Sequence, residues 1–125
     1  MAVYKIFPNK DTTLYSYYPD MNTGLDAMLE TSNTINISGN PIVSRYLIEY
    51  NTVEIQDIIN NKISGSDFNV YFKNLISTAQ GINTDVNLEI FATAQSWNNG
   101  TGYYLDNPKT TNGVSWGFRT TSGSG

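Results

Sequence analysis

The feature that most constrains the fold is the alternation of apolar and polar side chains in several short segments. Residues 43–50 place Tyr46, Ile48 and Tyr50 on one side of an extended chain. Two later segments alternate in the same way, with Phe68, Val70 and Phe72 in one and Val86, Leu88 and Ile90 in the other. Period-two alternation predicts half-buried β-strands, and we expect these three apolar sets to meet in one core.

The rest of the chain predicts further strands and one helix. Residues 2–7 and 12–18 are predicted strands, with a break at Pro8-Asn9, and residues 25–31 fit either a strand or a short helix. Ile55, Ile58 and Ile59 recur at helical spacing, which predicts a helix over 53–60. Strands separated by regular turn signals indicate an all-β fold, an antiparallel β-sandwich of jelly-roll type with one short helix.

The length of 125 residues is typical of one domain. We expect a β-sandwich domain over 1–121 and a Gly/Ser linker or tag over 122–125. Residues 96–116 combine glycines, a proline and aromatic side chains with little alternation, which predicts a long ordered loop. We expect Trp97 and Trp116 to be buried and to hold this loop against the sandwich.

Charge and composition argue against several classes of function. The net charge is −4 and the seven Lys and Arg are scattered, so no basic stripe is available for nucleic acid or an anionic membrane. No apolar run approaches the roughly 18 to 20 residues of a membrane span. The chain has no cysteine and no histidine, which removes thiolate metal sites and the usual near-neutral general base.

Carboxylates in the first third of the chain are the candidates for a metal site or a glycosidase pair: Asp11, Asp20, Asp26 and Glu30. Their spacing matches no EF-hand loop, and acidic residues in turns are usually solvated or cap backbone amides. The serines have no histidine base. We therefore expect a protein that is not an enzyme and needs no cofactor, with calcium as a less favoured alternative.

Aromatic residues are the one enrichment that suggests a binding surface. Tyrosine rings stack on sugar faces and are common in protein interfaces. The candidate surface contacts are Tyr15, Tyr17, Tyr18, Tyr103 and Tyr104. The structural alternative, which we favour for any single aromatic residue, is packing in the core.

The order of motifs resembles that of DNRLRE-type jelly-roll domains, which are related to a group of carbohydrate-binding modules. The resemblance covers four blocks, at 7–15, 19–30, 44–50 and 96–116. They contain an Asp-Thr opening strand, a Pro-x-x-Asn-x-Gly turn, an Arg-x-Leu strand beginning at Arg45, and a closing segment bracketed by Trp97 and Trp116. The resemblance implies structural roles for Arg45, Trp97 and Trp116. Asn51 and Asn98 stand where the family commonly has acidic residues.

Members of this family occur in secreted surface proteins and in structural proteins of tailed bacteriophages. The resemblance, together with an N-terminus that does not read as a secretion signal, implies a virion protein assembled in the host cytoplasm. A head fibre, neck, collar or tail-associated protein would contact other virion proteins, and a homo-oligomer such as a trimer is expected. The alternative is a carbohydrate-binding module of a surface protein, with a glycan as partner.

Overall fold

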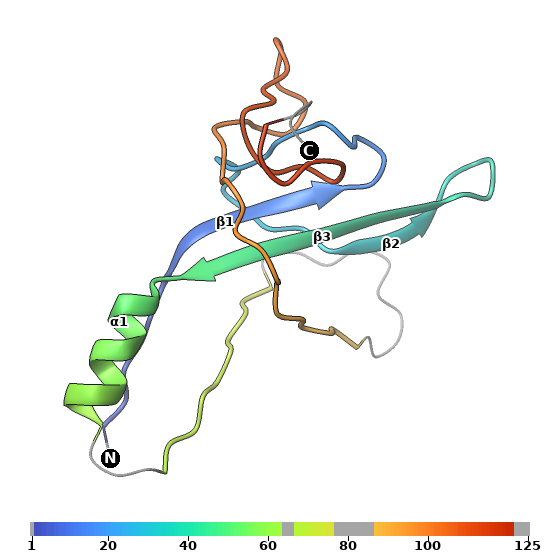
Figure 1. The fold of residues 1–125 in the computed structure, drawn as a ribbon. Coiled ribbons are helices and arrows are strands. Elements are labelled where there is room, and N and C mark those ends of the chain that lie inside the picture. The colour runs from blue at the N-terminus through green and yellow to red at the C-terminus, as the bar shows by residue number, and fades with distance from the viewer. Residues whose placement is uncertain (1, 64–66, 77–86, 122–125) are drawn as a thin grey trace.

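A computed structural model describes residues 2–63, 67–76 and 87–121, and its central feature is a three-stranded antiparallel sheet (Figure 1). The strands are β1 (Pro8–Tyr15), β2 (Ser32–Ile35) and β3 (Pro41–Tyr50). Their order in the sheet is β1-β3-β2, so the long strand β3 lies in the centre. The expected class of antiparallel β-structure with one short helix is therefore present, with three strands in the described part of the chain.

Two of the strands begin at a proline. The sequence predicts a break in strand structure at Pro8, whereas β1 begins there. Lys10 pairs with Glu49 and Tyr15 pairs with Ser44, and the register is irregular between Pro8 and Lys10. A proline at the first position of a strand removes no necessary ladder hydrogen bond, so Pro8 and Pro41 can both begin strands. The predicted strand over 2–7 was wrong, because these residues carry no regular structure.

A tight hairpin joins β2 to β3. The Asn36 side chain accepts hydrogen bonds from the backbone N–H groups of Ser38 and Asn40, both at 2.9 Å. Gly39 has a φ of 80° and completes the turn, as the Gly39-Asn40-Pro41 signal predicts. The sequence did not predict β2, because residues 25–31, expected to be a strand or a helix, form turns and irregular structure instead.

The predicted helix is confirmed as α1 (Thr52–Asp57), which continues into a π-helical turn, η1 (Ile58–Lys62). The Asn51 side chain caps α1 by accepting from the N–H groups of Val53 and Glu54. Ile58 is buried, while Ile59 is exposed. The helix extends from the end of β3 beside the N-terminal segment, where the Tyr4 hydroxyl donates to the Lys62 carbonyl at 3.3 Å (Figure 1).

The best-buried part of the molecule lies between β1 and two sets of loops. Residues 16–31 and 97–121 gather over one side of β1, as Figure 1 shows in blue, orange and red. The residues buried here are more often polar than apolar, namely Thr12, Thr13, Met21, Asn22, Thr23, Ser44, Trp97, Val114 and Ser115. This core therefore depends on hydrogen bonds as well as on apolar contact.

The predicted apolar core is wrong. Phe68, Val70 and Phe72 are exposed, as are Leu88 and Ile90, and residues 67–76 and 87–93 form no strand. The expected face of β3, with Tyr46, Ile48 and Tyr50, is half-buried, and so are Leu47 and Glu49 on the opposite face. Val86 lies outside the described residues. Alternation identified segments able to form strands, but it did not determine what they pair with.

Among the described residues, no helix is long and apolar enough to cross a membrane.

Candidate functional site

The loops over β1 are organised by one buried side chain, Asn22, which is 0% exposed. Its Nδ2 donates to the carbonyls of Asn99 and Val114, both at 2.8 Å. Its Oδ1 accepts from the backbone N–H groups of Gly102 at 2.9 Å and Gly24 at 3.3 Å. All four hydrogen-bonding positions of the amide are therefore used. Asn22 ties together three stretches of chain that lie up to 92 residues apart.

Glycines allow the backbone to approach Asn22 closely. An added Cβ on Gly113 would lie 2.5 Å from Asn22 Nδ2, and one on Gly102 would overlap the Asn22 carbonyl oxygen. An added Cβ on Gly100, whose φ is 76°, would also overlap the amide, at 2.3 Å from Asn22 Oδ1. We call Asn22 and these three glycines the Asn22 hub. The Asn99 Oδ1 atom, beside the hub, is the one buried side-chain polar atom of the described residues that lacks a partner.

The next residue, Thr23, joins the hub to the sheet. Its hydroxyl donates to the Thr13 carbonyl at 2.7 Å and accepts from the Thr13 N–H at 3.2 Å. The Thr12 hydroxyl lies 3.2 Å from it. The backbone N–H and carbonyl of Thr13, on the outer edge of β1, thus both have a hydrogen-bond partner in Thr23. The loop is therefore held in a fixed position relative to β1.

Beside the hub, four tyrosines from two loops and the end of β1 form a hollow of about 260 Å³, which we call the tyrosine hollow. Tyr15 and Tyr104 have ring centroids 5.1 Å apart, and Tyr18 lies edge-on to Tyr104 at 6.1 Å. Tyr17 packs edge-on against Tyr18 at 4.9 Å. The remaining lining residues come from the loop before β2 and from β2 and β3, namely Glu30, Ser32, Thr34 and Ile42.

One carboxylate lies in this hollow. The Tyr15 hydroxyl donates to Glu30 Oε2 at 3.3 Å. Burial, followed by the negative charge of Glu30, raises the pKa of Tyr15 well above its usual value. Burial and the neighbouring Tyr18 raise the pKa of Tyr104 as well. Both phenols stay protonated at neutral pH, so the hollow offers aromatic faces, neutral hydroxyls and one acceptor carboxylate.

Tyr104 reaches the hollow because the hub holds its loop. The Gly102 carbonyl accepts from the Leu25 N–H at 3.0 Å, and the Tyr104 N–H donates to Asp26 Oδ1 at 3.1 Å. Tyr103 is exposed and does not line the hollow. Of the five tyrosines singled out from the sequence, four come together and Tyr103 does not.

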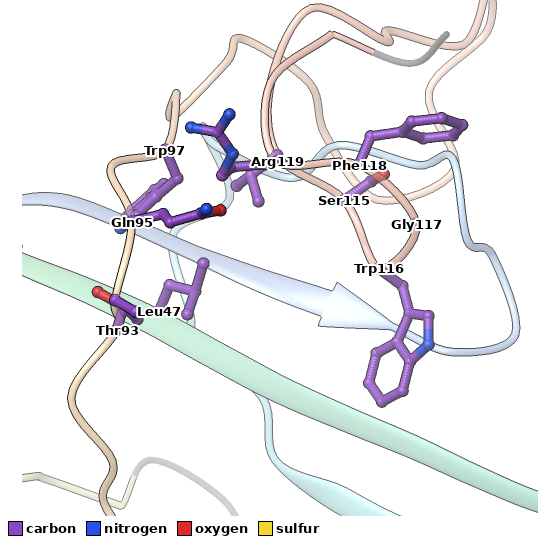
Figure 2. Close-up of a pocket in the computed structure, with 11 residues that line it drawn as sticks. Leu47, Thr93, Gln95, Trp97, Ser115, Trp116, Gly117, Phe118 and Arg119 are labelled. Carbon is purple, nitrogen blue, oxygen red and sulfur yellow. The ribbon is translucent and has the colours of Figure 1, made fainter. Parts of the chain in front are cut away.

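A second and more open hollow, of about 430 Å³, lies between the sheet and the closing loop (Figure 2). Leu47 points into it from β3, Thr93 and Gln95 border it on one side, and Trp116 borders it on the other. Figure 2 shows the Phe118 ring pointing away from the sheet. Arg119 lies towards Trp97, and its Nη1 donates to the Ser96 carbonyl at 3.1 Å. We call this surface the tryptophan hollow.

The two tryptophans differ in burial. Trp97 is 4% exposed, as expected, and Lys10 lies 5.6 Å from its ring centroid. Lys10 also forms an ion pair with Glu49 at 2.8 Å. Trp116 is 37% exposed, so the prediction that it is buried was wrong. The exposed Arg45 lies 5.4 Å from the Trp116 ring centroid, so each tryptophan ring has a cation beside it.

The acidic residues of the first third do not converge. Asp20 pairs with Lys109 at 2.5 Å, a contact that lowers the pKa of Asp20, and Asp26 accepts from the Tyr104 backbone. Glu30 lies in the tyrosine hollow, and Asp11 is on β1. Within the described ranges, no three acidic side chains form a group that could hold a metal ion.

Comparison with known proteins adds no assignment, since no family model, curated protein or solved structure matches the chain.

Sequence reasoning overlooked Asn22 and Thr23 as structural residues and treated Asn22-Thr23-Gly24 only as a turn. A signal was available, because a Pro-x-x-Asn-x-Gly turn and glycines at 100, 102 and 113 are all present. The sequence did not reveal that these positions meet in space.

Proposed function

We propose that this chain is a non-enzymatic structural component of a bacteriophage virion, such as a head fibre, a neck or collar protein or a tail-associated protein, and that it acts by protein contact. The observation that carries the contact role is the tyrosine hollow. Four tyrosine rings form a row of three ring contacts beside a loop fixed by the Asn22 hub. Rigid aromatic side chains contribute large contact area at low conformational-entropy cost, as expected of an interface centre.

Support for the virion setting comes from the motif resemblance to DNRLRE-type domains, and we retain their jelly-roll sandwich as a proposal. One layer of that sandwich would be the three-stranded sheet.

The test is docking to particles that lack this protein. The purified chain should bind such particles saturably at micromolar concentration, as measured by cosedimentation and by electron microscopy of tagged chains. Tyr104→Ala should weaken binding at least about tenfold, because it removes a ring at the centre of the hollow. Tyr103→Ala is the matched control, since Tyr103 is the exposed neighbour outside the hollow. Equal loss in both variants, or no docking of the unaltered chain, contradicts the proposal.

A carbohydrate-binding module is the second candidate, and the composition of the same hollow favours it. Tyrosine faces can stack on sugar rings, while Glu30, Ser32 and Thr34 supply polar groups for sugar hydroxyls. Glycan-array binding that is lost in Tyr104→Ala and kept in Tyr103→Ala, without docking to particles, would favour this candidate over the first.

A further inference from the structure

The tyrosine hollow presents several aromatic faces to one place. Tyr15 and Tyr104 have ring centroids 5.1 Å apart, and Tyr18 meets Tyr104 at an interplanar angle of 82°. Rings that meet nearly at right angles present two faces to one corner. The face of an aromatic ring carries the negative charge of its π-electrons and attracts a cation that lies within about 6 Å of the ring centroid. A cation in the hollow would therefore lie over more than one attracting face.

Two carboxylates add negative charge to the tyrosine hollow. Glu30 lines it, and Asp26 lies beside it, where Asp26 Oδ1 accepts from the Tyr104 N–H at 3.1 Å. Burial, then Glu30 and more weakly Asp26 raise the pKa of Tyr15, so the charges of both carboxylates reach the hydroxyl in the hollow. No ion pair of the described residues includes Glu30 or Asp26. The described part of the chain therefore gives neither carboxylate a cationic partner.

The lysines and arginines of the chain lie elsewhere. All seven of them are in the described ranges, and none lines the tyrosine hollow. Two lie beside the tryptophans instead, with Lys10 at 5.6 Å from the Trp97 ring centroid and Arg45 at 5.4 Å from that of Trp116. The tyrosine hollow thus offers the same kind of aromatic surface together with a carboxylate, but no basic side chain of this chain lines it.

We infer that the tyrosine hollow receives a lysine or arginine side chain of a protein partner. Such a side chain has an apolar stem, which can lie along Ile42 and the tyrosine faces, and a charged end whose N–H groups can donate to Glu30. A neutral side chain or a sugar gains less from this site, because the negative charge of the rings and of Glu30 acts most strongly on a full positive charge. This inference rests on the proposed contact function of the same hollow and names the chemistry of its partner.

The first test measures the binding of small probes to the full unaltered chain at low salt. The cationic probes are N-acetyl-lysine methylamide and N-acetyl-arginine methylamide, and their neutral counterparts contain norleucine and citrulline. Binding is followed by the NMR signals of the backbone amides at 15–18 and 30–34. We expect each cationic probe to bind at least about threefold more tightly than its neutral counterpart, because the rings and Glu30 attract the charge. Equal dissociation constants, or signals that shift only elsewhere, would overturn the inference.

The second test assigns the preference for cationic probes to particular side chains. Glu30→Gln keeps the size of the side chain and an acceptor oxygen but removes the charge, so the preference should fall at least about twofold. Glu89→Gln is the matched control, because it removes one negative charge at an exposed position outside the hollow, and it should leave the preference unchanged. Tyr104→Leu replaces an aromatic face by an aliphatic side chain and should lower the preference, whereas Tyr103→Leu should not. Equal changes in the two glutamine variants contradict a cation site in the hollow.

The probes and the particles together separate the cation site from the proposed function. Docking to particles that depends on Tyr104, without any preference for cationic probes, would leave the contact function standing and overturn the inference. Selective binding of the cationic probes in the hollow, without docking to particles, would support the cation site and contradict the virion function. The titration of the unaltered chain is decisive even if a variant fails to fold, because it uses no substitution.

Discussion

The Asn22 hub is buried although it is polar, whereas residues 67–76 and 87–93, which we call the two apolar segments, are exposed although they are rich in apolar side chains. The hub is polar, yet Asn22 is fully buried and satisfies four backbone groups. The apolar segments are rich in aromatic and aliphatic side chains, yet Val70 and Leu75 lie in the open. Hydrophobicity makes burial favourable, but an element needs a partner surface before it can be buried. An amide that uses every donor and acceptor can organise a core without apolar area.

The largest expected loss of stability comes from a substitution at the centre of the hub. Asn22→Ala leaves the Asn99 and Val114 carbonyls and the Gly24 and Gly102 N–H groups without partners. Losses of this kind cost roughly 1 to 3 kcal/mol per buried group, so we expect about 4 kcal/mol or more of lost stability in urea denaturation. Asn69→Ala, an exposed amide in the first apolar segment, is the control and should change stability by less than about 0.5 kcal/mol. Similar losses of stability in both variants would show that the buried amide of the hub contributes no more to stability than an exposed amide in the apolar segments.

The next largest loss of stability is expected for one of the two tryptophans and not for the other. Trp97→Ala removes a buried ring and should cost about 3 to 4 kcal/mol. Trp116→Ala removes a partly exposed ring that contacts Arg45 and should cost about 1 kcal/mol or less. Thermal denaturation of both variants measures the difference. A greater loss for Trp116 would mean that the tryptophan hollow is closed in solution.

A smaller loss of stability is expected when a methyl group is added at the hub. Gly113→Ala places a Cβ 2.5 Å from both Asn22 Nδ2 and Gly100 Cα, so the loops must move apart. Overpacking of this kind costs about 2 to 3 kcal/mol. Gly39→Ala is the comparison, because Gly39 has a positive φ but no atom within 4 Å of an added Cβ, and it should cost about 1 kcal/mol from backbone strain alone. Equal melting temperatures for the two variants would show that the hub tolerates expansion.

The smallest effect is expected in the apolar segments. Val70→Ala removes two methyl groups that are mostly exposed in a single chain, so it should cost less than about 0.5 kcal/mol at concentrations where light scattering finds single chains. Urea denaturation at these concentrations is the measurement. A loss of about 2 kcal/mol instead would show that this segment packs on the sheet of its own chain.

Local chemistry within the sequence was enough to predict the strand at 43–50, the helix at 53–60 and the turn at 39–41, since alternation, helical spacing and turn residues act over a few neighbours. It also singled out five tyrosines as candidates for one surface, of which Tyr15, Tyr17, Tyr18 and Tyr104 line one hollow and Tyr103 does not. Only the tertiary structure decided which partners these elements have. Asn22 gains its role from residues up to 92 positions away. Trp97 is 4% exposed and Trp116 37%, although each ring has a cation beside it. Contacts at such separations depend on how loops close in space, and no periodicity in a single sequence records that closure.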